Sequence, residues 1–484
     1  MRIVRVTPFL IAVAAILGAC STSNPATVAL VLEGVLVDAA VSVEPAFRPD
    51  IHDYNVWCED GQNTVSISLA SGEELPEAQI SKWGSEDRTV KTRDGAVRAQ
   101  LSPGDLLSVG AYHFRCLPTD FPRLSIDGEI PGGAWVAMGL IESRFTNHDT
   151  SNPRLGEYAV VIDEHGAVVW YQKVDTPMNV TPVDRDRIAW LSDTAQMGVN
   201  LDPNKTFEVH SFTSEKVSAI RGPAGWAVDF HELEFKDDKI YGIVTQTRDN
   251  QPGYDARVVI DGIAELTPGH EALLFDSSEH IDPLETDRGV LPLDPPLVEP
   301  VHMNSVQVLD NGDFLVCARN LNEVFLVSNK TKKVAWRIRG AGSPPVQGNK
   351  DGAVLLNVPQ GDLFRQAHDA RLAADGTLSI FDNHTGTPSN ARVVLYQLDL
   401  ARGEASAVSY RSSENRSDSV GSARVFQDGF VVSWGDRLSP LVEMVEKSGE
   451  SLFSVRGEGG VITYRAIPVA KDFFDADTLR RSVK

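Results

Sequence analysis

Three histidines occupy matching positions, each just before an apolar, alternating run that leads into a tight turn. They are His231 before "ELEFKDD", His302 before "MNSVQVLDNG" and His368 before "DARLAADG". Asn304 lies two residues after His302 and therefore on the same face of an extended strand. A type I′ turn at Asn311-Gly312 would fold this strand back and set Asn304 opposite Arg319. A second hairpin, folded about a turn at 374–377, would likewise set Asn383 opposite His368.

This combination of side chains suits the binding and transfer of a tetrahedral oxyanion. Arginine presents a planar fork of N–H donors to sulfate or phosphate oxygens, and histidine can act as nucleophile, acid or base near neutral pH. Glu232 and Asp369 directly follow two of the histidines, so along a strand they face away from them. Three histidines can also bind Zn²⁺, but the neighbouring cation of Arg319 argues against it, and we predict no metal and no cofactor. Taken singly, each residue also has an ordinary structural explanation, such as a hydrogen bond at a strand end.

A weak repeat supplies the elements that would bring these side chains together. Polar residues and a glycine precede an apolar run in "DEHGAVVWY" (163–171), "DNGDFLVCA" (310–318), "ADGTLSIFD" (374–382) and "QDGFVVSWG" (427–435). A second paired run follows the last three, so that two hairpins give four strands per repeat, the pattern of a propeller blade.

We count about six such units and predict a six-bladed β-propeller over residues 123–484. Its innermost strands would line a central channel. The mouth of that channel would be formed by His231, His302, Asn304, Arg319, His368 and Asn383. Stacked hairpins of a sandwich or a solenoid are the alternative.

The region before the repeats, residues 28–122, contains short β-type runs broken by glycine, proline and aspartate, which predicts a small β-sandwich. The fold class predicted for the whole chain is therefore all-β. Cys58 and Cys116 each end one of these runs, and we predict a disulfide between them because an exported protein meets an oxidising compartment. Cys317 lies within the apolar run "FLVCAR" and is expected to be a buried free thiol.

The first twenty residues are typical of an exported lipoprotein. Residues 1–19 carry Arg2 and Arg5 before an apolar run, which indicates a secretory signal peptide. The run ends in Leu-Gly-Ala-Cys, which resembles a bacterial lipobox, so Cys20 would be lipidated and residues 20–27 would form a tether. In that resemblance Ser21 favours an anchor in the outer membrane, with the protein in the periplasm. A cleaved signal with a chance cysteine is the alternative.

Charge excludes two classes of partner. The chain has 484 residues, with 45 basic and 67 acidic side chains and a net charge of −22. Such a chain repels nucleic acid and anionic lipid, and the sequence has no basic stripe with interleaved aromatic residues. We expect no nucleic-acid partner, and contact with a membrane only through the lipid anchor.

At the histidine segments the sequence resembles the bacterial arylsulfotransferases, the aryl-sulfate sulfotransferases that use no nucleotide donor. "VHMNSVQVLDNGDFLVCARNLNEVFLVSNKTKKVAWRIRG" is similar to that family's His-x-Asn-Ser strand, its following arginine strand and an outer hairpin with tryptophan. "QAHDARLAADGTLSIFDN", "DFHELEF" and "GSARVFQDGFVVSWGD" are similar to three further segments, and the resemblance covers most of residues 124–470. It implies a six-bladed propeller that transfers a sulfuryl group from a phenolic sulfate ester to a phenol in a ping-pong reaction.

Carried over by motif, the resemblance implies a role for each residue. His368 would be the nucleophile that becomes sulfated. His231 and His302 would flank it, acting as acid or base and binding sulfuryl oxygens. Asn304 and Arg319 would hold the same oxygens and stabilise charge as the S–O bond breaks.

Two positions depart from the family pattern, and two other functions stay open. Ala318 precedes the arginine where the family often has serine, and Glu232 follows His231 where some relatives have histidine or aspartate. A sulfate- or phosphate-ester hydrolase on the same scaffold would use water in place of phenol. A non-catalytic binding or assembly propeller would have the same fold, because fold alone does not decide function. The oligomeric state, monomer or homodimer, also stays open.

Overall fold

The computed structural model describes residues 35–39, 42–69, 75–142, 155–192, 198–286, 297–346, 349–414 and 417–483. Within these residues the fold is all-β, as predicted, and its helical segments are short: α1 (Ser277–His280), α2 (Ala476–Arg481) and the 3₁₀ turns Pro283–Glu285, Gln360–Asp362 and Glu458–Gly460. The predicted signal peptide, the lipidated Cys20 and the tether lie outside the described residues. None of the described helices is long and apolar enough to cross a bilayer.

The N-terminal region forms two sheets that share one apolar core. The smaller sheet has the order β1 (Val35–Ala39), β4 (Asn63–Leu69) and β7 (Ala96–Leu101). The larger has the order β2 (Val43–Glu44), β3 (Asp53–Trp57), β9 (Tyr112–Leu117), β8 (Leu106–Val109), β5 (Ala78–Ser81) and β6 (Arg88–Val90). Alternate side chains of both sheets, such as Ile67 and Val97 from one and Tyr54 and Phe114 from the other, pack in a single cluster.

The predicted disulfide between Cys58 and Cys116 is confirmed, with the two Cα atoms 5.5 Å apart. It joins the end of β3 to β9, which pair as parallel neighbours. Cys317 is free and buried, also as expected, and its thiol donates a hydrogen bond to the carbonyl of Ala367 at 3.1 Å.

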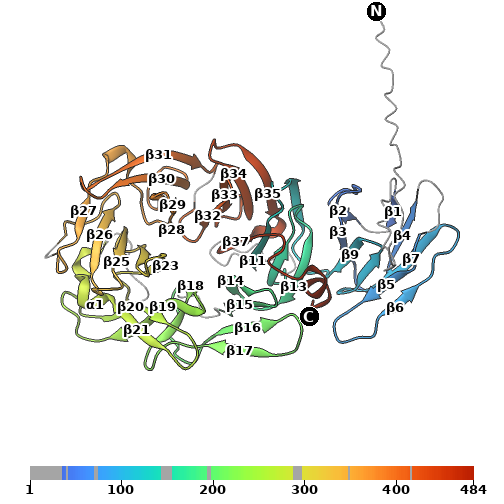
Figure 1. The fold of residues 1–484 in the computed structure, drawn as a ribbon, viewed down its shortest axis with the longest axis horizontal. Helices are drawn as coiled ribbons and strands as arrows, with labels where there is room; N and C mark the ends of the chain where they lie inside the picture. Colours follow the sequence, from blue (N-terminus) through green and yellow to red (C-terminus); the bar gives the residue numbers. More distant parts are fainter. Residues whose placement is uncertain are drawn as a thin grey trace, which may run out of the picture.

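The rest of the described chain forms six sheets of four or five strands, which follow one another around a ring (Figure 1). The first three hold β11 (Trp135–Glu142), β12 (Tyr158–Ile162) and β13 (Val168–Lys173) with β36 (Val461–Ile462) and β37 (Ala466–Val469); β14 (Pro177–Asp184), β15 (Arg187–Ser192), β16 (Phe207–Ser211) and β17 (Val217–Ile220); and β18 (Ala227–Lys236), β19 (Lys239–Arg248), β20 (Arg257–Glu265) and β21 (Ala272–Asp276) with β22 (Leu297–Val298).

The other three sheets complete the ring. They hold β23 (Met303–Val308), β24 (Phe314–Ala318), β25 (Glu323–Val327), β26 (Val334–Arg339) and β27 (Val354–Leu356); β28 (His368–Leu372), β29 (Thr377–Asp382), β30 (Arg392–Asp399) and β31 (Glu404–Ser412); and β32 (Ser422–Phe426), β33 (Gly429–Ser433), β34 (Val442–Glu446) and β35 (Ser451–Gly457) with β10 (Leu124–Gly128).

The ring is closed twice by strands from opposite ends of the chain. The late strand β37 pairs with β11, with Trp135 opposite Val469. The early strand β10 pairs with β35, with Leu124 opposite Gly457. The first and last sheets therefore each contain strands that are more than 300 residues apart in sequence.

Neighbouring sheets are joined at the centre of the ring by bonds between their innermost strands, which are β14, β18, β23, β28, β32 and β37 (Figure 1). An innermost strand has one edge without a ladder partner, and its buried N–H groups need acceptors. Side chains from the preceding innermost strand accept from them. Four such bonds are Glu234 Oε1 from Val308 N (3.0 Å), Gln307 Oε1 from Leu372 N (2.7 Å), Asp369 Oδ2 from Ala423 N (3.1 Å) and Ser422 Oγ from Ala466 N (3.2 Å).

Candidate active site

The three histidines singled out by the sequence lie together on neighbouring innermost strands: His368 begins β28, His302 directly precedes β23, and His231 lies in the middle of β18. The imidazole rings of His231 and His302 have their centroids 4.8 Å apart. His368 is close enough to both for their charges to affect its pKa, and Arg319 acts on it more strongly still. His231 and His368 are 4% and 2% exposed, so the cluster is buried within the wall of the ring.

Irregularities of the strands aim these side chains. The register of β18 against β19 slips between Val228 and Leu233, the segment that contains His231. The register of β23 slips at Asn304, and that of β28 slips just after His368. His302 itself has a φ of 53°, in the left-handed region that non-glycine residues seldom adopt. Bulges of this kind redirect a side chain out of the regular alternation and are common beside active sites.

These irregularities make two sequence predictions wrong. Within the turn after β23 only Gly312 has a positive φ, and the turn spans five residues, closed by Leu309 N bonded to Asp313 O at 2.9 Å, instead of being a type I′ turn at Asn311-Gly312. Together with the bulge at Asn304, this turn sets Arg319 opposite His302 and not opposite Asn304. The backbone N–H of Arg319 donates to the carbonyl of His302 at 2.9 Å.

The expected pairing of Asn383 with His368 is also wrong in register, although the two side chains do meet. His368 stands opposite Phe381 in the ladder. Even so, His368 Nδ1 lies 2.7 Å from Asn383 Oδ1. The amide nitrogen of Asn383 donates to the carbonyl of Val420 at 2.9 Å, which fixes the amide with its oxygen toward the histidine.

The other two histidines each have a buried carboxyl group on Nδ1. His231 Nδ1 is bonded to Asp229 Oδ1, and His302 Nδ1 lies 2.6 Å from Glu299 Oε2. Neither acid was among the residues predicted from the sequence. Asp229 lies two residues before its histidine on the same strand, a spacing that alternation alone could have revealed. Glu299 precedes β23, and its approach depends on the unusual φ of His302.

Burial and positive charge keep the histidines neutral. Burial, followed by the cation of Arg319, lowers the pKa of His302 to about 3 and lowers that of His368 well below its ordinary value. Burial also lowers the pKa of His231, although Asp229 opposes this. In a neutral imidazole one nitrogen carries the proton and the other carries a lone pair, so the Nδ1 partner decides which role Nε2 can play.

The two carboxyl groups differ in protonation. The pKa of Asp229 is lowered, because the attraction of His231 and several hydrogen bonds outweigh the cost of burial. Burial raises the pKa of Glu299 to about 8, and the nearby Asp229 adds to this rise while His231 and Arg319 oppose it. One histidine therefore faces a carboxylate and the other a carboxylic acid at neutral pH.

Arg319 and Asn304 have distinct surroundings. The guanidinium of Arg319 donates to Asn320 Oδ1 at 3.1 Å and to the carbonyl of Asp418 at 3.0 Å, both neutral acceptors. The amide of Asn304 donates to the carbonyl of Ala367 at 2.8 Å, directly before His368 in the chain. Its Oδ1 is buried and accepts no hydrogen bond from any described residue.

A layer of paired charges lies beside the histidines, toward the other end of the same strands. As expected from alternation, Glu232 and Asp369 do not join the histidines but bind arginines. The ion pairs of this layer are Arg371 Nη2 to Glu232 Oε2 (2.6 Å) and to Asp369 Oδ1 (2.7 Å), Arg424 Nε to Asp369 Oδ2 (2.8 Å) and Arg465 Nη1 to Glu232 Oε1 (2.9 Å). Buried charges are tolerated only when paired in this way. Among the described residues no group of three or more His, Cys, Asp or Glu is arranged to hold a metal ion.

Comparison with known proteins adds a family assignment. The model of the family described as Arylsulfotransferase (ASST) matches residues 197–456. No curated protein matches the chain. Among solved structures, the chain is similar to a Bacteroides caccae protein of unknown function (10% identity, 69% of this chain and 98% of that chain covered, TM-score 0.40). It is also similar to a periplasmic gluconolactonase of Pseudomonas aeruginosa (12% identity, 70% and 99% covered, TM-score 0.36).

Proposed function

The chain belongs to the arylsulfotransferase family, and from this premise we propose that it transfers a sulfuryl group from a phenolic sulfate ester to a phenol through a sulfated His368. The observation that carries the proposal is the meeting of three neutral histidines and Arg319 in one buried cluster. We interpret the six sheets as the blades of a six-bladed propeller and the N-terminal pair of sheets as a sandwich beside it. Export to the periplasm and lipidation at Cys20 remain part of this proposal.

His368 is suited to be the nucleophile because its tautomer is set by an acceptor. Asn383 Oδ1 can only accept, so His368 Nδ1 carries the proton and Nε2 carries the lone pair. Nε2 attacks the sulfur of the donor, an N–S bond forms, and the S–O bond to the phenol breaks with its electrons leaving on the phenolate oxygen. Arg319 would hold the sulfuryl oxygens through charge-assisted hydrogen bonds during this step.

His302 is suited to protonate the leaving phenolate. Protonated Glu299 donates to His302 Nδ1, so Nε2 carries the hydrogen that the phenolate accepts. As Nε2 gives up its proton, Glu299 passes its own proton to Nδ1 and becomes a carboxylate, so the imidazole stays neutral throughout. This route avoids an imidazolium beside the cation of Arg319.

His231 is suited to activate the incoming phenol. Its Nδ1–H is held by the ionised Asp229, which leaves the lone pair of Nε2 to accept the phenol proton as the oxygen attacks sulfur. The N–S bond breaks and His368 regains its lone pair. Passage of the proton from His231 to the pair of His302 and Glu299 restores the starting state, across rings 4.8 Å apart.

Asn304 has a supporting place in this scheme. Its amide holds the carbonyl of Ala367, next to the nucleophile, and thereby fixes the start of β28. Its role as a ligand of the sulfuryl oxygens stays a prediction, as does the binding role of Asn383.

The test is a paired transfer assay on purified protein. Release of nitrophenol from 4-nitrophenyl sulfate is followed with and without phenol, for the wild type, for His368→Ala and for the exposed control His270→Ala. We expect release that depends on phenol, is lost in His368→Ala and is kept in His270→Ala. Release that needs no phenol would identify a hydrolase instead. Folded protein with no release from any of several aryl sulfates would favour a binding propeller.

A further inference from the structure

A cavity lies among the innermost strands, toward the end opposite the histidines. It encloses about 300 Å³, and each of the six innermost strands contributes to its wall. On β23 and β28 the histidines stand at the start of the strand, whereas the residues that line this cavity, Gln307 and Arg371, stand near its end. The layer of paired charges forms the wall of this cavity through Glu232, Arg371 and Arg424, and none of the three histidines lines it, so the cavity does not belong to the histidine site.

One wall of the cavity carries Arg371, Arg424, Glu232 and Glu234, and its charged groups pair with Arg465 and Asp369 behind them. Three guanidinium groups, those of Arg371, Arg424 and Arg465, share the carboxylates of Glu232 and Asp369. The remaining acid at this wall is Glu234, which lies 3.7 Å from Arg371 Nη1. When Glu234 is protonated, one cation is left without a counter-charge.

Arg371 Nε, Arg465 Nε and Arg424 Nη2 each lack a hydrogen-bond acceptor among the described residues, and Arg424 is the most exposed of these three arginines. Its Nε donates to Asp369 at 2.8 Å, but Nη2 lies 3.7 Å from the nearest oxygen of Glu232, too far for a hydrogen bond. Nη2 has no hydrogen-bond acceptor among the described residues. The side chain is 20% exposed, whereas those of Arg371 and Arg465 are 9% and 1% exposed, so Arg424 is the arginine that a ligand in the cavity can reach.

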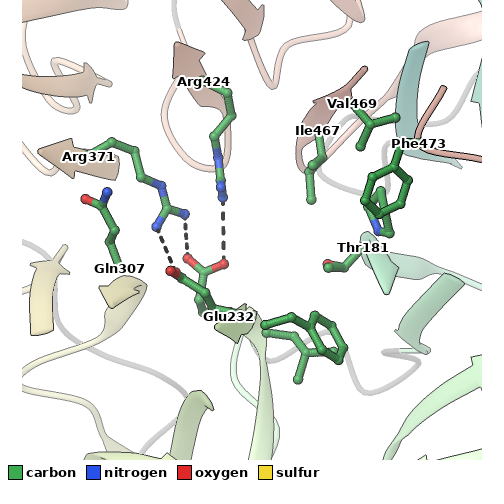
Figure 2. A pocket seen from close by; sticks show the side chains of 12 residues that line it. Thr181, Glu232, Gln307, Arg371, Arg424, Ile467, Val469 and Phe473 are labelled. Atoms are coloured by element: carbon green, nitrogen blue, oxygen red, sulfur yellow. Dashed lines mark hydrogen bonds and ion pairs between the residues drawn. The ribbon is translucent and has the colours of Figure 1, made fainter. Parts of the chain in front are cut away.

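The opposite wall is apolar. Ile467 and Val469 of β37 and Phe473 after it face the arginines across the cavity, as Figure 2 shows. Phe235 of β18 adds a second aromatic ring to the lining. A ligand that satisfied both walls would have an anionic group at one end and a flat apolar body at the other.

We propose that this cavity binds an aromatic monoanion, a carboxylate or a sulfate monoester, with its anionic group on Arg424 and its ring against Ile467, Val469 and Phe473. Guanidinium groups bind planar carboxylates and sulfate oxygens through two parallel N–H donors, which matches the incomplete bonding of Arg424. The site is independent of the proposed catalysis and requires no chemistry at the histidines.

Binding should weaken as pH rises, because a second anion appears at the wall. Burial raises the pKa of Glu234 to about 7, with Glu232 adding to the rise and Arg371 and Arg424 opposing it. The nearby Lys236 is paired with Asp310 at 2.6 Å, which raises its pKa and keeps it charged. Below pH 7 the protonated Glu234 leaves the surplus cation for the ligand, and above pH 7 its carboxylate competes with the ligand.

The experiment is calorimetric titration of the intact protein with sodium benzoate at pH 6, with neutral benzyl alcohol as the uncharged comparison. We expect benzoate to bind at least tenfold more tightly than benzyl alcohol. Arg424→Gln should weaken benzoate at least tenfold, the exposed Arg221→Gln should leave it unchanged, and Glu234→Gln should remove the loss of affinity between pH 6 and pH 8. Should Arg424→Gln fail to fold, Val469→Glu, which sets a negative charge on the apolar wall, must also abolish binding.

A second arm separates this site from the catalytic one. Benzoate and phenyl sulfate are titrated into His368→Ala, which cannot consume the sulfate ester. Binding that is retained in His368→Ala and lost when Arg424→Gln is added supports the second site and identifies which anion it accepts, because Arg319 remains in both variants. Equal affinity for benzyl alcohol, insensitivity to Arg424→Gln and Val469→Glu, no heat of binding with either anion, or loss of binding in His368→Ala would each overturn the proposal. None of these outcomes depends on whether the protein transfers sulfuryl groups.

Discussion

Two clusters of ionisable side chains share the same innermost strands and the same burial, but they hold charge in opposite ways. In the histidine cluster, burial and Arg319 remove charge, so the imidazoles are neutral. In the arginine and carboxylate layer, charges persist because each carboxylate is held by more than one guanidinium. The neighbours His368 and Asp369 belong to different clusters. Burial alone therefore does not decide whether a group ionises, and the identity of the partner does.

The two clusters also differ in what they can do: the histidine cluster can react, and the layer of paired charges can only stabilise the fold. A neutral imidazole with a set tautomer can give or accept a proton or attack sulfur. A carboxylate such as Asp369, whose pKa its arginines hold far below the ordinary range even though burial opposes this, can do neither. We therefore expect substitutions in the first cluster to change rate and those in the second to change stability.

The largest expected effect is that of His368→Ala on transfer. Loss of the nucleophile should lower kcat for 4-nitrophenyl sulfate by at least about 10⁴-fold, because a water molecule at the vacated position is not held in line with the sulfur atom as Nε2 is. Steady-state kinetics would measure this, and circular dichroism would show the fold retained. If His368→Ala kept a tenth of the wild-type rate, the nucleophile would be another residue, and the histidine cluster would not be the reactive one of the two.

Glu232→Gln should act on stability. Removing this charge leaves Arg371 and Arg465 without a full counter-charge in a buried place, which costs about 3–5 kcal/mol of the free energy of unfolding. Urea denaturation measures it, with the exposed Glu86→Gln as the matched control. A loss below about 1 kcal/mol would mean that the layer is not held by its charges.

Glu299→Gln should slow transfer without weakening substrate binding. The amide can still donate to His302 Nδ1 and keep the tautomer, but it has no proton to pass on, so kcat for phenyl sulfate should fall about 10²-fold while KM is unchanged. In the wild type, activity should fall as pH rises through about 8, where Glu299 loses its proton. An unaltered pH profile in the variant would assign the proton to another group.

Ser422→Ala should give the smallest effect. It removes the Oγ that accepts from Ala466 N at 3.2 Å and leaves that buried N–H without an acceptor, at a cost of about 1 kcal/mol. Chemical denaturation compared with the exposed Ser448→Ala would detect the difference. Equal stability of the two variants would show that bonds between innermost strands contribute little.

The fold class and the meeting of the histidines could be predicted because they rest on alternation and repetition. The positions of Asn304 and Arg319 relative to each other could not, since a single bulge shifts every later pair by one residue and leaves no mark in a hydrophobic pattern. Glu299 was missed because it lies before β23, next to a residue with a left-handed φ, where strand alternation does not apply.

The closing strand was also hidden from sequence reasoning. "AIPV" in β37 is short and contains proline, which argues against a central strand. Its neighbour Arg465 completes the layer of paired charges, bonded to Glu232 and to the carbonyl of Asn304. Only the strand pairing reveals that so brief a segment links the site to the first sheet.

The double closure of the ring imposes an order in time. Polypeptides are made from the N-terminus, so β11 must wait for β37 until more than 300 further residues have been synthesised. During that interval the edge of β11 is an unpaired, apolar template of the kind that recruits other chains. A nascent chain of this protein therefore depends on being kept apart from its copies until its final strand arrives, and a ribosome that stops before Ala466 yields a ring without the closure between β37 and β11.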